Sequence, residues 1–174
     1  FDHLGLATGG YYPGADDNAS GTSGLIELAT LLQGSSPKRS ILFLACSGEE
    51  KGLLGSEAFA SKPPIDLTKV VANVNLDMIG RNATRTLYVT PAAVSNKVTT
   101  LVTKARQLVL TKDLDLSKGI DQYWQQSDHY SFAKRNIPSI FFNSGIHSDL
   151  HETTDTADKI DYVKMTRAVD LARD

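Results

Sequence analysis

Four short apolar runs, each with the length of a β-strand, alternate along the chain with segments of helical spacing. The apolar runs cover 39–46 (RSILFLAC), 70–79 (VVANVNLDMI), 85–90 (RTLYVT) and 137–143 (IPSIFFN). Apolar residues recur at helical intervals over 18–33, 94–110 and 160–173, and shorter helices are predicted over 53–61 and 127–136. Strands that alternate with helices favour a mostly parallel sheet with helices on both faces. The sequence therefore predicts an α/β sandwich.

The size and composition of the chain fit one globular domain over residues 1–174. The chain is 41% hydrophobic and 22% charged, which argues against a disordered protein. Its 18 Lys and Arg residues against 20 Asp and Glu residues give a net charge of -2, so nucleic acid is not expected as a partner. No apolar run approaches the roughly 20 residues of a membrane span. The single cysteine, Cys46, cannot form a disulfide within the chain.

Acidic side chains occur at the expected carboxyl ends of the strands, where functional residues of parallel sheets collect. Glu49 and Glu50 follow the first apolar run, and Asp77 interrupts the second near its end. Asp17 precedes the first predicted helix, and His151 lies in a polar loop near the C-terminus. Each has an ordinary explanation when taken alone: a solvated turn, a hydrogen-bonded buried carboxylate, a helix cap or an exposed loop histidine.

Together these side chains have the donor chemistry of a metal-dependent hydrolytic site. Mixed oxygen and nitrogen ligands suit zinc, with cobalt or manganese as substitutes. Two neighbouring carboxylates can divide the work, since one binds a metal while the other moves a proton. The single cysteine excludes the cysteine cluster of a structural zinc finger. The set therefore favours hydrolysis by an activated water.

The motifs that carry these residues resemble those of the zinc exopeptidases of peptidase family M28, the aminopeptidase family. GADDNASG, GEEKGLLGS, NLDMIGR, SDHYSF and HETTDT occur in the order of that family, and the resemblance runs from residue 1 to about residue 160. It implies a three-layer α/β/α sandwich with a mixed, mostly parallel central sheet, the phosphorylase/hydrolase-like fold of these exopeptidases. It also implies a peptide substrate, two zinc ions and, on the resemblance alone, a secreted or periplasmic location.

The resemblance assigns roles residue by residue. Asp17 matches the aspartate that bridges both zinc ions, and Glu50 and His151 match ligands of one of them. Asp77 matches a ligand of the other ion. Glu49 matches the general acid/base, which takes a proton from the attacking water and passes it to the leaving amine. These roles imply a zinc aminopeptidase.

Other residues are predicted to support the ligands rather than to bind metal. Asp2 matches the aspartate that orients the family's first histidine ligand, and Asp128 and His129 are predicted to act at the pocket rim in the same supporting way. Many relatives carry a tyrosine just before the last histidine ligand, where this chain has Leu150. Stabilisation of the oxyanion is therefore assigned to the metals or to another donor.

The first five residues, FDHLG, resemble the second half of the family's first metal motif. In that motif the ligand is a histidine whose position falls immediately before Phe1, and His3 is out of register with it by two residues. We therefore expect that His3 is not a ligand and that N-terminal strands of the fold are missing from this chain. We also expect one zinc to bind better than two, because Glu50 and His151 retain their site whereas the Asp77 site lacks its histidine.

Two other functions fit parts of this pattern. A glutaminyl-cyclase-like acyltransferase has a similar fold and one zinc, but it is expected to differ around 14–21 and 47–56, where this chain follows the peptidase pattern. A catalytically inactive, peptidase-like binding domain is the second alternative, and the retention of Asp17, Glu49, Glu50, Asp77 and His151 argues against it. The sequence does not indicate the substrate side chain, the oligomeric state, or a choice between exopeptidase, dipeptidase and amidase action.

Overall fold

A four-stranded mixed sheet forms the centre of the computed structural model, which describes residues 3–91, 96–109, 111–117 and 120–174, the side chains of 96–99 excepted. The strands are β3 (Asn73–Leu76), β4 (Thr86–Thr90), β5 (Asp115–Ser117) and β6 (Ser139–Asn143). Their order across the sheet is β3-β6-β4-β5. β3 is parallel to β6 and β4 is parallel to β5, whereas β4 and β6 are antiparallel. The predicted α/β fold with a mixed, mostly parallel sheet is confirmed.

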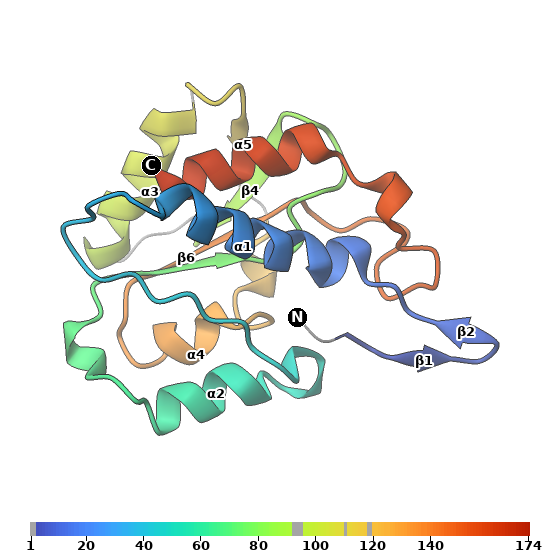
Figure 1. Cartoon of the computed structure of the whole chain (residues 1–174), viewed down its shortest axis with the longest axis horizontal. Helices are drawn as coiled ribbons and strands as arrows, with labels where there is room; N and C mark the ends of the chain where they lie inside the picture. Colours follow the sequence, from blue (N-terminus) through green and yellow to red (C-terminus); the bar gives the residue numbers. More distant parts are fainter. Residues whose placement is uncertain (1–2, 92–95, 110, 118–119) are drawn as a thin grey trace.

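Helices cover both faces of this sheet (Figure 1). The helices over one face are α1 (Gly21–Leu32), α3 (Asn96–Val109) and α5 (Tyr162–Arg173). The helices over the other face are α2 (Leu54–Ser61) and α4 (His129–Ala133). All of these correspond to helical segments of the sequence pattern, so the predicted three layers are present.

The two faces of the sheet bury separate apolar clusters. Ile140 and Phe142 of β6 lie in the larger cluster with side chains of α1, α3 and α5. Phe141, between them in the sequence, stacks instead on the ring of His129 in α4. This alternation is the period of two that a strand imposes on its side chains. A strand that is apolar on both faces therefore joins the two helical layers.

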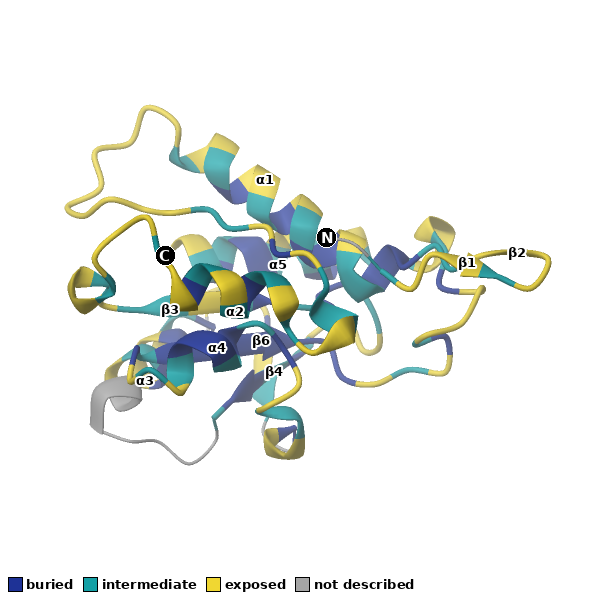
Figure 2. Cartoon of the chain, turned by 90° about the horizontal axis from the view of Figure 1, so that it is seen from below, coloured by how far each residue is buried: buried dark blue, intermediate teal, exposed yellow. Residues whose placement is uncertain are grey.

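Short elements complete the described chain. Three-residue helices occur at Glu49–Lys51, Leu67–Lys69, Asp121–Tyr123 and Ala157–Lys159, and an irregular helical turn spans Ala15–Ser20. β1 (Leu6–Ala7) and β2 (Gly10–Tyr11) form an antiparallel hairpin. Figure 2 shows this hairpin projecting from the body, and Leu6 at its base is 89% exposed. The sequence pattern did not predict the hairpin.

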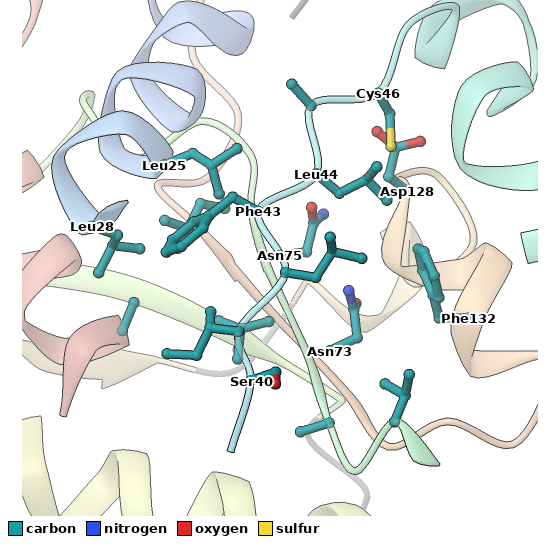
Figure 3. A pocket seen from close by; sticks show the side chains of 18 of the residues that line it. Leu25, Leu28, Ser40, Phe43, Leu44, Cys46, Asn73, Asn75, Asp128 and Phe132 are labelled. Atoms are coloured by element: carbon teal, nitrogen blue, oxygen red, sulfur yellow. The ribbon is translucent and has the colours of Figure 1, made fainter. Parts of the chain in front are cut away.

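The run 39–46, predicted as a buried strand, is not a strand in the structure. It joins neither sheet of the described residues, although its sequence is apolar on both faces. This run and β3 both line a groove of about 1050 Å³, and Leu25, Phe43 and Leu44 form part of its wall (Figure 3). Among the described residues no ladder of backbone hydrogen bonds joins this run to β3. The apolar pattern was a sound reason to predict a strand, but a strand also needs a neighbour.

The parallel pair β3 and β6 determines where the polar motifs meet. β3 ends at Leu76, and the next residue, Asp77, donates its N–H to the Phe142 oxygen at 3.3 Å. Nδ2 of Asn143, at the end of β6, donates a hydrogen bond to the backbone oxygen of Asp77 at 2.6 Å. Asp77 is thus fixed at the carboxyl edge of the sheet. Among the helices of the described residues, none has the length and apolar character required to cross a bilayer.

Candidate active site

Asn18 fixes the acidic loop ahead of α1 against the end of β3. Its side-chain oxygen accepts hydrogen bonds from the N–H groups of Gly21 at 2.9 Å and Met78 at 3.1 Å, and its Nδ2 donates to the Leu76 oxygen at 3.1 Å. Gly21 permits this approach, because a Cβ there would lie 2.1 Å from the Leu76 oxygen. The loop is therefore more than a helix cap: it brings Asp17 to the functional edge of the sheet.

Glu49 and Glu50 reach the same edge through a tight turn. Gly48 has a φ of 68°, in the left-handed region that favours glycine, and the chain then enters the short helix that contains both glutamates. Both line a cavity of about 440 Å³, and Asp17, Asp77 and His151 line the same cavity. The structure thus brings together the five residues to which the sequence assigned metal-binding or catalytic roles.

His151 contacts two of the carboxylates directly. Its Nε2 lies 3.1 Å from Asp17 Oδ2 and 3.1 Å from Glu50 Oε1. The side chains of Asp17 and Glu50 are largely buried, whereas that of His151 is 49% exposed. The histidine therefore closes the cluster from the solvent side.

His3 joins this cluster, although the motif register places it outside the ligand set. Its Nδ1 lies 3.0 Å from Glu50 Oε1 and 3.9 Å from Asp17 Oδ2. One ligand atom from each of His3, Asp17 and Glu50 lies within 4.8 Å of the others. The ring packs on Gly14, where a Cβ would come within 2.7 Å of it. Asp2, predicted to orient the first histidine ligand, lies outside the described residues.

Asp77 is partly buried, and only one of its two carboxylate oxygens is hydrogen-bonded among the described residues. Ser127 Oγ donates to its Oδ2 at 2.6 Å, and Asn75 Nδ2 donates to Ser127 Oγ at 2.7 Å. Its Oδ1 has no hydrogen-bond partner among the described residues. A buried carboxylate oxygen without a donor is costly unless a proton or a cation approaches it. A fully hydrogen-bonded aspartate, the ordinary explanation for this residue, is therefore not what the structure shows.

The carboxyl groups oppose one another's ionisation. Burial, followed by the Asp77 charge, raises the pKa of Glu49 to about 9. Burial and the Asp17 charge raise the pKa of Asp77 to about 7, and burial and the Glu50 charge raise the pKa of Asp17 to about 6. Glu50 is the exception, because its hydrogen bond to His3 lowers its pKa. This crowding of negative charge favours a cation in the cavity.

The donor set fits a zinc ion. Imidazole nitrogens of His3 and His151 and carboxylate oxygens of Asp17 and Glu50 converge within a few ångströms. Asp77 Oδ1, in the same cavity lining, is a buried atom without a hydrogen-bond partner among the described residues. Mixed nitrogen and oxygen donors of this kind are typical zinc ligands.

His129 does not contact Asp77 directly but is connected to it through other side chains. Its ring is fully buried and stacks on Phe141 with ring centroids 4.6 Å apart. Its Nδ1 lies 3.4 Å from Asn75 Nδ2, and the Asn75 and Ser127 side chains connect it to Asp77. The predicted supporting role of His129 thus corresponds to an indirect connection.

Asp128 lies beside Cys46 (Figure 3), and its charge also contributes to the raised pKa values of Asp77 and Glu49. Burial, and then the Asp128 charge, raises the pKa of the Cys46 thiol to about 12, so this thiol is protonated at neutral pH. The direct contact with Asp77 is made by Ser127, the first residue of the SDHYSF motif. Sequence reasoning missed Ser127 and Asn18, since only the folded contacts distinguish them from other polar loop residues.

The buried imidazole of His129 predicts a loss of stability in acid. Burial lowers the pKa of His129 to about 4, against about 6.5 for an unfolded histidine. Its contribution to the free energy of unfolding is therefore present above pH 6.5 and is lost as the pH falls from 6.5 to 4, by roughly 3 kcal/mol. Denaturant unfolding of the metal-free protein and of a His129→Phe variant at several pH values measures this difference. Parallel pH profiles for the two proteins would contradict the prediction.

The fold and the cluster together define an α/β protein with a carboxylate–histidine centre suited to zinc at the carboxyl edge of its sheet. Comparison with known sequences agrees with this class. The profile of peptidase family M28 matches residues 1–174, and the chain belongs to that family.

The sequence relatives include a bacterial aminopeptidase and probable leucine aminopeptidases of fungi. The chain is 32% identical over 171 residues to the aminopeptidase YwaD of Bacillus subtilis strain 168. This alignment covers 92% of this chain and 36% of the relative. It is 31% identical over 163 residues to a probable leucine aminopeptidase of Arthroderma otae, in an alignment that covers 88% of this chain and 44% of the relative. The chain thus spans less than half the length of these relatives.

Solved structures show the same fold. A zinc aminopeptidase from Bacillus subtilis superposes with a TM-score of 0.80 at 29% identity, covering 97% of this chain and 42% of that protein. The glutaminyl cyclase of Porphyromonas gingivalis superposes with a TM-score of 0.65 at 20% identity, covering 94% of this chain and 63% of that protein. At that identity the second likeness concerns the fold alone.

Proposed function

We propose that the protein is a zinc-dependent exopeptidase that removes N-terminal residues from peptides. The observation that carries the proposal is that His151 Nε2 lies 3.1 Å from a carboxylate oxygen of both Asp17 and Glu50, in a cavity that Glu49 also lines. Membership of family M28 and the aminopeptidase relatives support the same reaction. The secreted or periplasmic location stays a prediction.

Asp17, Glu50 and His151 are the proposed ligands of the first zinc ion, and His3 supplies a further nitrogen beside them. Asp77, with its unpartnered Oδ1, is the proposed ligand of a second ion that Asp17 would share. The first site has two histidines, whereas no histidine contact is recorded for Asp77 in the described residues. We therefore expect one zinc to bind tightly and a second to bind weakly.

Glu49 is the proposed general base and acid. Bound zinc supplies a Lewis acid that polarises the scissile carbonyl, activates water and lowers the pKa of nearby carboxyl groups. Glu49 accepts the proton of the attacking water and then donates it to the leaving amine, which breaks the peptide bond. Glu49 is partly buried and lines the same cavity as the proposed ligands, so its carboxyl faces the space where a substrate would bind.

The test is a zinc titration followed by two activity assays. Calorimetry on the chelator-treated protein is expected to give one tight site, and the zinc-loaded protein is expected to release nitroaniline from aminoacyl nitroanilides. Pyroglutamate formation from an N-terminal glutaminyl peptide is measured in parallel. Cyclisation without hydrolysis would favour the glutaminyl-cyclase alternative, and the absence of zinc binding would favour an inactive binding domain.

The walls of the cavity suggest a preference for apolar side chains at the substrate's N-terminus. Ile120, Tyr123, Phe141, Ile146 and Leu150 line the cavity that holds the predicted site. Burial of a leucine side chain contributes about 1.5–3 kcal/mol, which corresponds to a preference of about 10- to 150-fold over a small or charged residue. The ratio of kcat/KM for leucyl and glutamyl nitroanilides measures it. Equal values for the two substrates would show that this wall does not select the side chain.

A further inference from the structure

Asp155 is a fully buried carboxylate in the HETTDT motif, outside the proposed ligand set. It lies four residues after His151, in the same loop. Two features of its surroundings connect it with the candidate metal site: the backbone groups that its side chain accepts from, and the arginine that pairs with it.

The first feature is a set of contacts with the loop that carries Asp17. Asp155 Oδ2 accepts hydrogen bonds from the backbone N–H groups of Asp16 at 2.9 Å and Asp17 at 3.1 Å. The Asp155 backbone oxygen accepts a third, from Ala15 N–H at 3.1 Å. Three successive N–H groups of the Asp17 loop are thus held by one residue of the His151 loop. Hydrogen bonds to a charged acceptor are stronger than those between neutral groups.

The second feature is an arginine that joins the two ends of the His151 loop. Arg81 NH1 lies 3.3 Å from Asp155 Oδ1, and Arg81 NH2 pairs with Asp149. Asp149 and Asp155 flank His151 by two and four residues, so one guanidinium spans the histidine's loop. A planar group with several donors suits such a double contact, which a lysine could not make in the same way.

Arg81 is itself attached to the rigid body of the fold. Its backbone N–H donates to Ser144 Oγ at 3.3 Å, and its backbone oxygen accepts from the buried Lys164 Nζ at 2.5 Å. Lys164 lies in α5 and Ser144 directly follows β6. Arg81 therefore anchors the His151 loop to the end of β6 and to α5.

We propose that Asp155 and Arg81 are positioning residues that hold the Asp17 and His151 loops in register so that both side chains reach one metal ion. This inference rests on the proposed function, because it concerns the same zinc site. His151 needs such support: its side chain is half exposed and its φ is 58°, a conformation that few residues other than glycine adopt. Partners outside the ligand shell typically change metal affinity by about 10- to 100-fold when they are removed.

The experiment compares Asp155→Asn and Arg81→Lys with the wild-type protein. Asp155→Asn keeps the shape of the side chain but removes the negative charge of the carboxylate that accepts two backbone N–H groups. Arg81→Lys keeps the positive charge but removes the planar guanidinium that contacts two carboxylates. Glu57→Gln is the matched control, since Glu57 also pairs with an arginine, Arg135, but does not line the cavity. Circular dichroism first verifies folding. Calorimetry with zinc and the visible spectrum of the cobalt-substituted protein then report the site.

A fall in zinc affinity of about 10- to 100-fold in Asp155→Asn, with a changed cobalt spectrum and a normal control, is the expected result. Arg81→Lys is expected to shift both readouts in the same direction. Zinc affinity within about twofold of wild type and an unchanged spectrum in the folded variants would overturn the inference. Loss of folding in both variants would also overturn it, because the residues would then support the fold generally. Failure of the wild-type protein to bind zinc would refute the proposed function instead.

Discussion

Replacement of Glu49 by glutamine is expected to lower kcat/KM about 10²- to 10⁴-fold, the usual contribution of a general acid/base. The amide has nearly the same shape, but it cannot accept a proton from water. Glu49 lines the cavity, and burial together with the Asp77 charge raises its pKa to about 9 in the metal-free protein. The measurement is hydrolysis of a leucyl nitroanilide by the zinc-loaded variant.

The same variant is expected to retain zinc, because the proposed ligands Asp17, Glu50 and His151 are unchanged. Calorimetry checks this point. Glu152→Gln is the matched control, since Glu152 is exposed and directly follows His151 in the sequence. If Glu49→Gln lost zinc and activity together, Glu49 would be a ligand and the proposed division between the two glutamates would be wrong.

Asp17→Asn is expected to reduce zinc affinity at least about 100-fold, beyond the usual effect of an outer partner, and to abolish measurable hydrolysis. Asp17 Oδ2 is 3.1 Å from His151 Nε2 and 3.9 Å from His3 Nδ1, so this carboxylate lies within reach of both histidines. An amide is a much poorer zinc donor than a carboxylate. Zinc calorimetry and the nitroanilide assay measure the two effects.

Stability provides the control for this variant. Burial and the Glu50 charge disfavour ionised Asp17 and raise its pKa to about 6, so removal of this charge is expected to leave the metal-free protein at least as stable at pH 7. Asp158→Asn changes an exposed aspartate near the His151 loop that does not line the cavity, and it is expected to leave zinc affinity unchanged. Asp17→Asn with normal zinc affinity would remove Asp17 from the ligand set.

The predictable part of the fold is the part whose residues carry their own periodic signal. The helices α1, α2 and α5 and the strands β3, β4 and β6 arise where apolar spacing predicted them. The run 39–46 had an equally strong signal, but a strand is completed by a neighbour's hydrogen bonds, and among the described residues this run joins no sheet. The hairpin of β1 and β2 and the short strand β5 lie outside the runs that the apolar pattern identified.

The candidate site shows the same division. The motifs identified Asp17, Glu49, Glu50, Asp77 and His151 as one set, and these five line one cavity. His3 was judged by its register in a motif, yet its position depends on the path of the folded chain across Gly14. Ser127 and Asp155 were polar residues among many until their contacts with Asp77 and the Asp17 loop were visible.

The sequence by itself determined the fold class, the family and the identity of the acidic and histidine side chains, because periodicity and motif order are properties of residues near one another in the chain. The tertiary structure decided which partners surround each of those side chains. Asp155 and Asp17 are 138 residues apart, and Ser127 and Asp77 are 50 apart. Contacts over such distances arise from the packing of β3, β6 and the loops at their ends, and no local pattern encodes them.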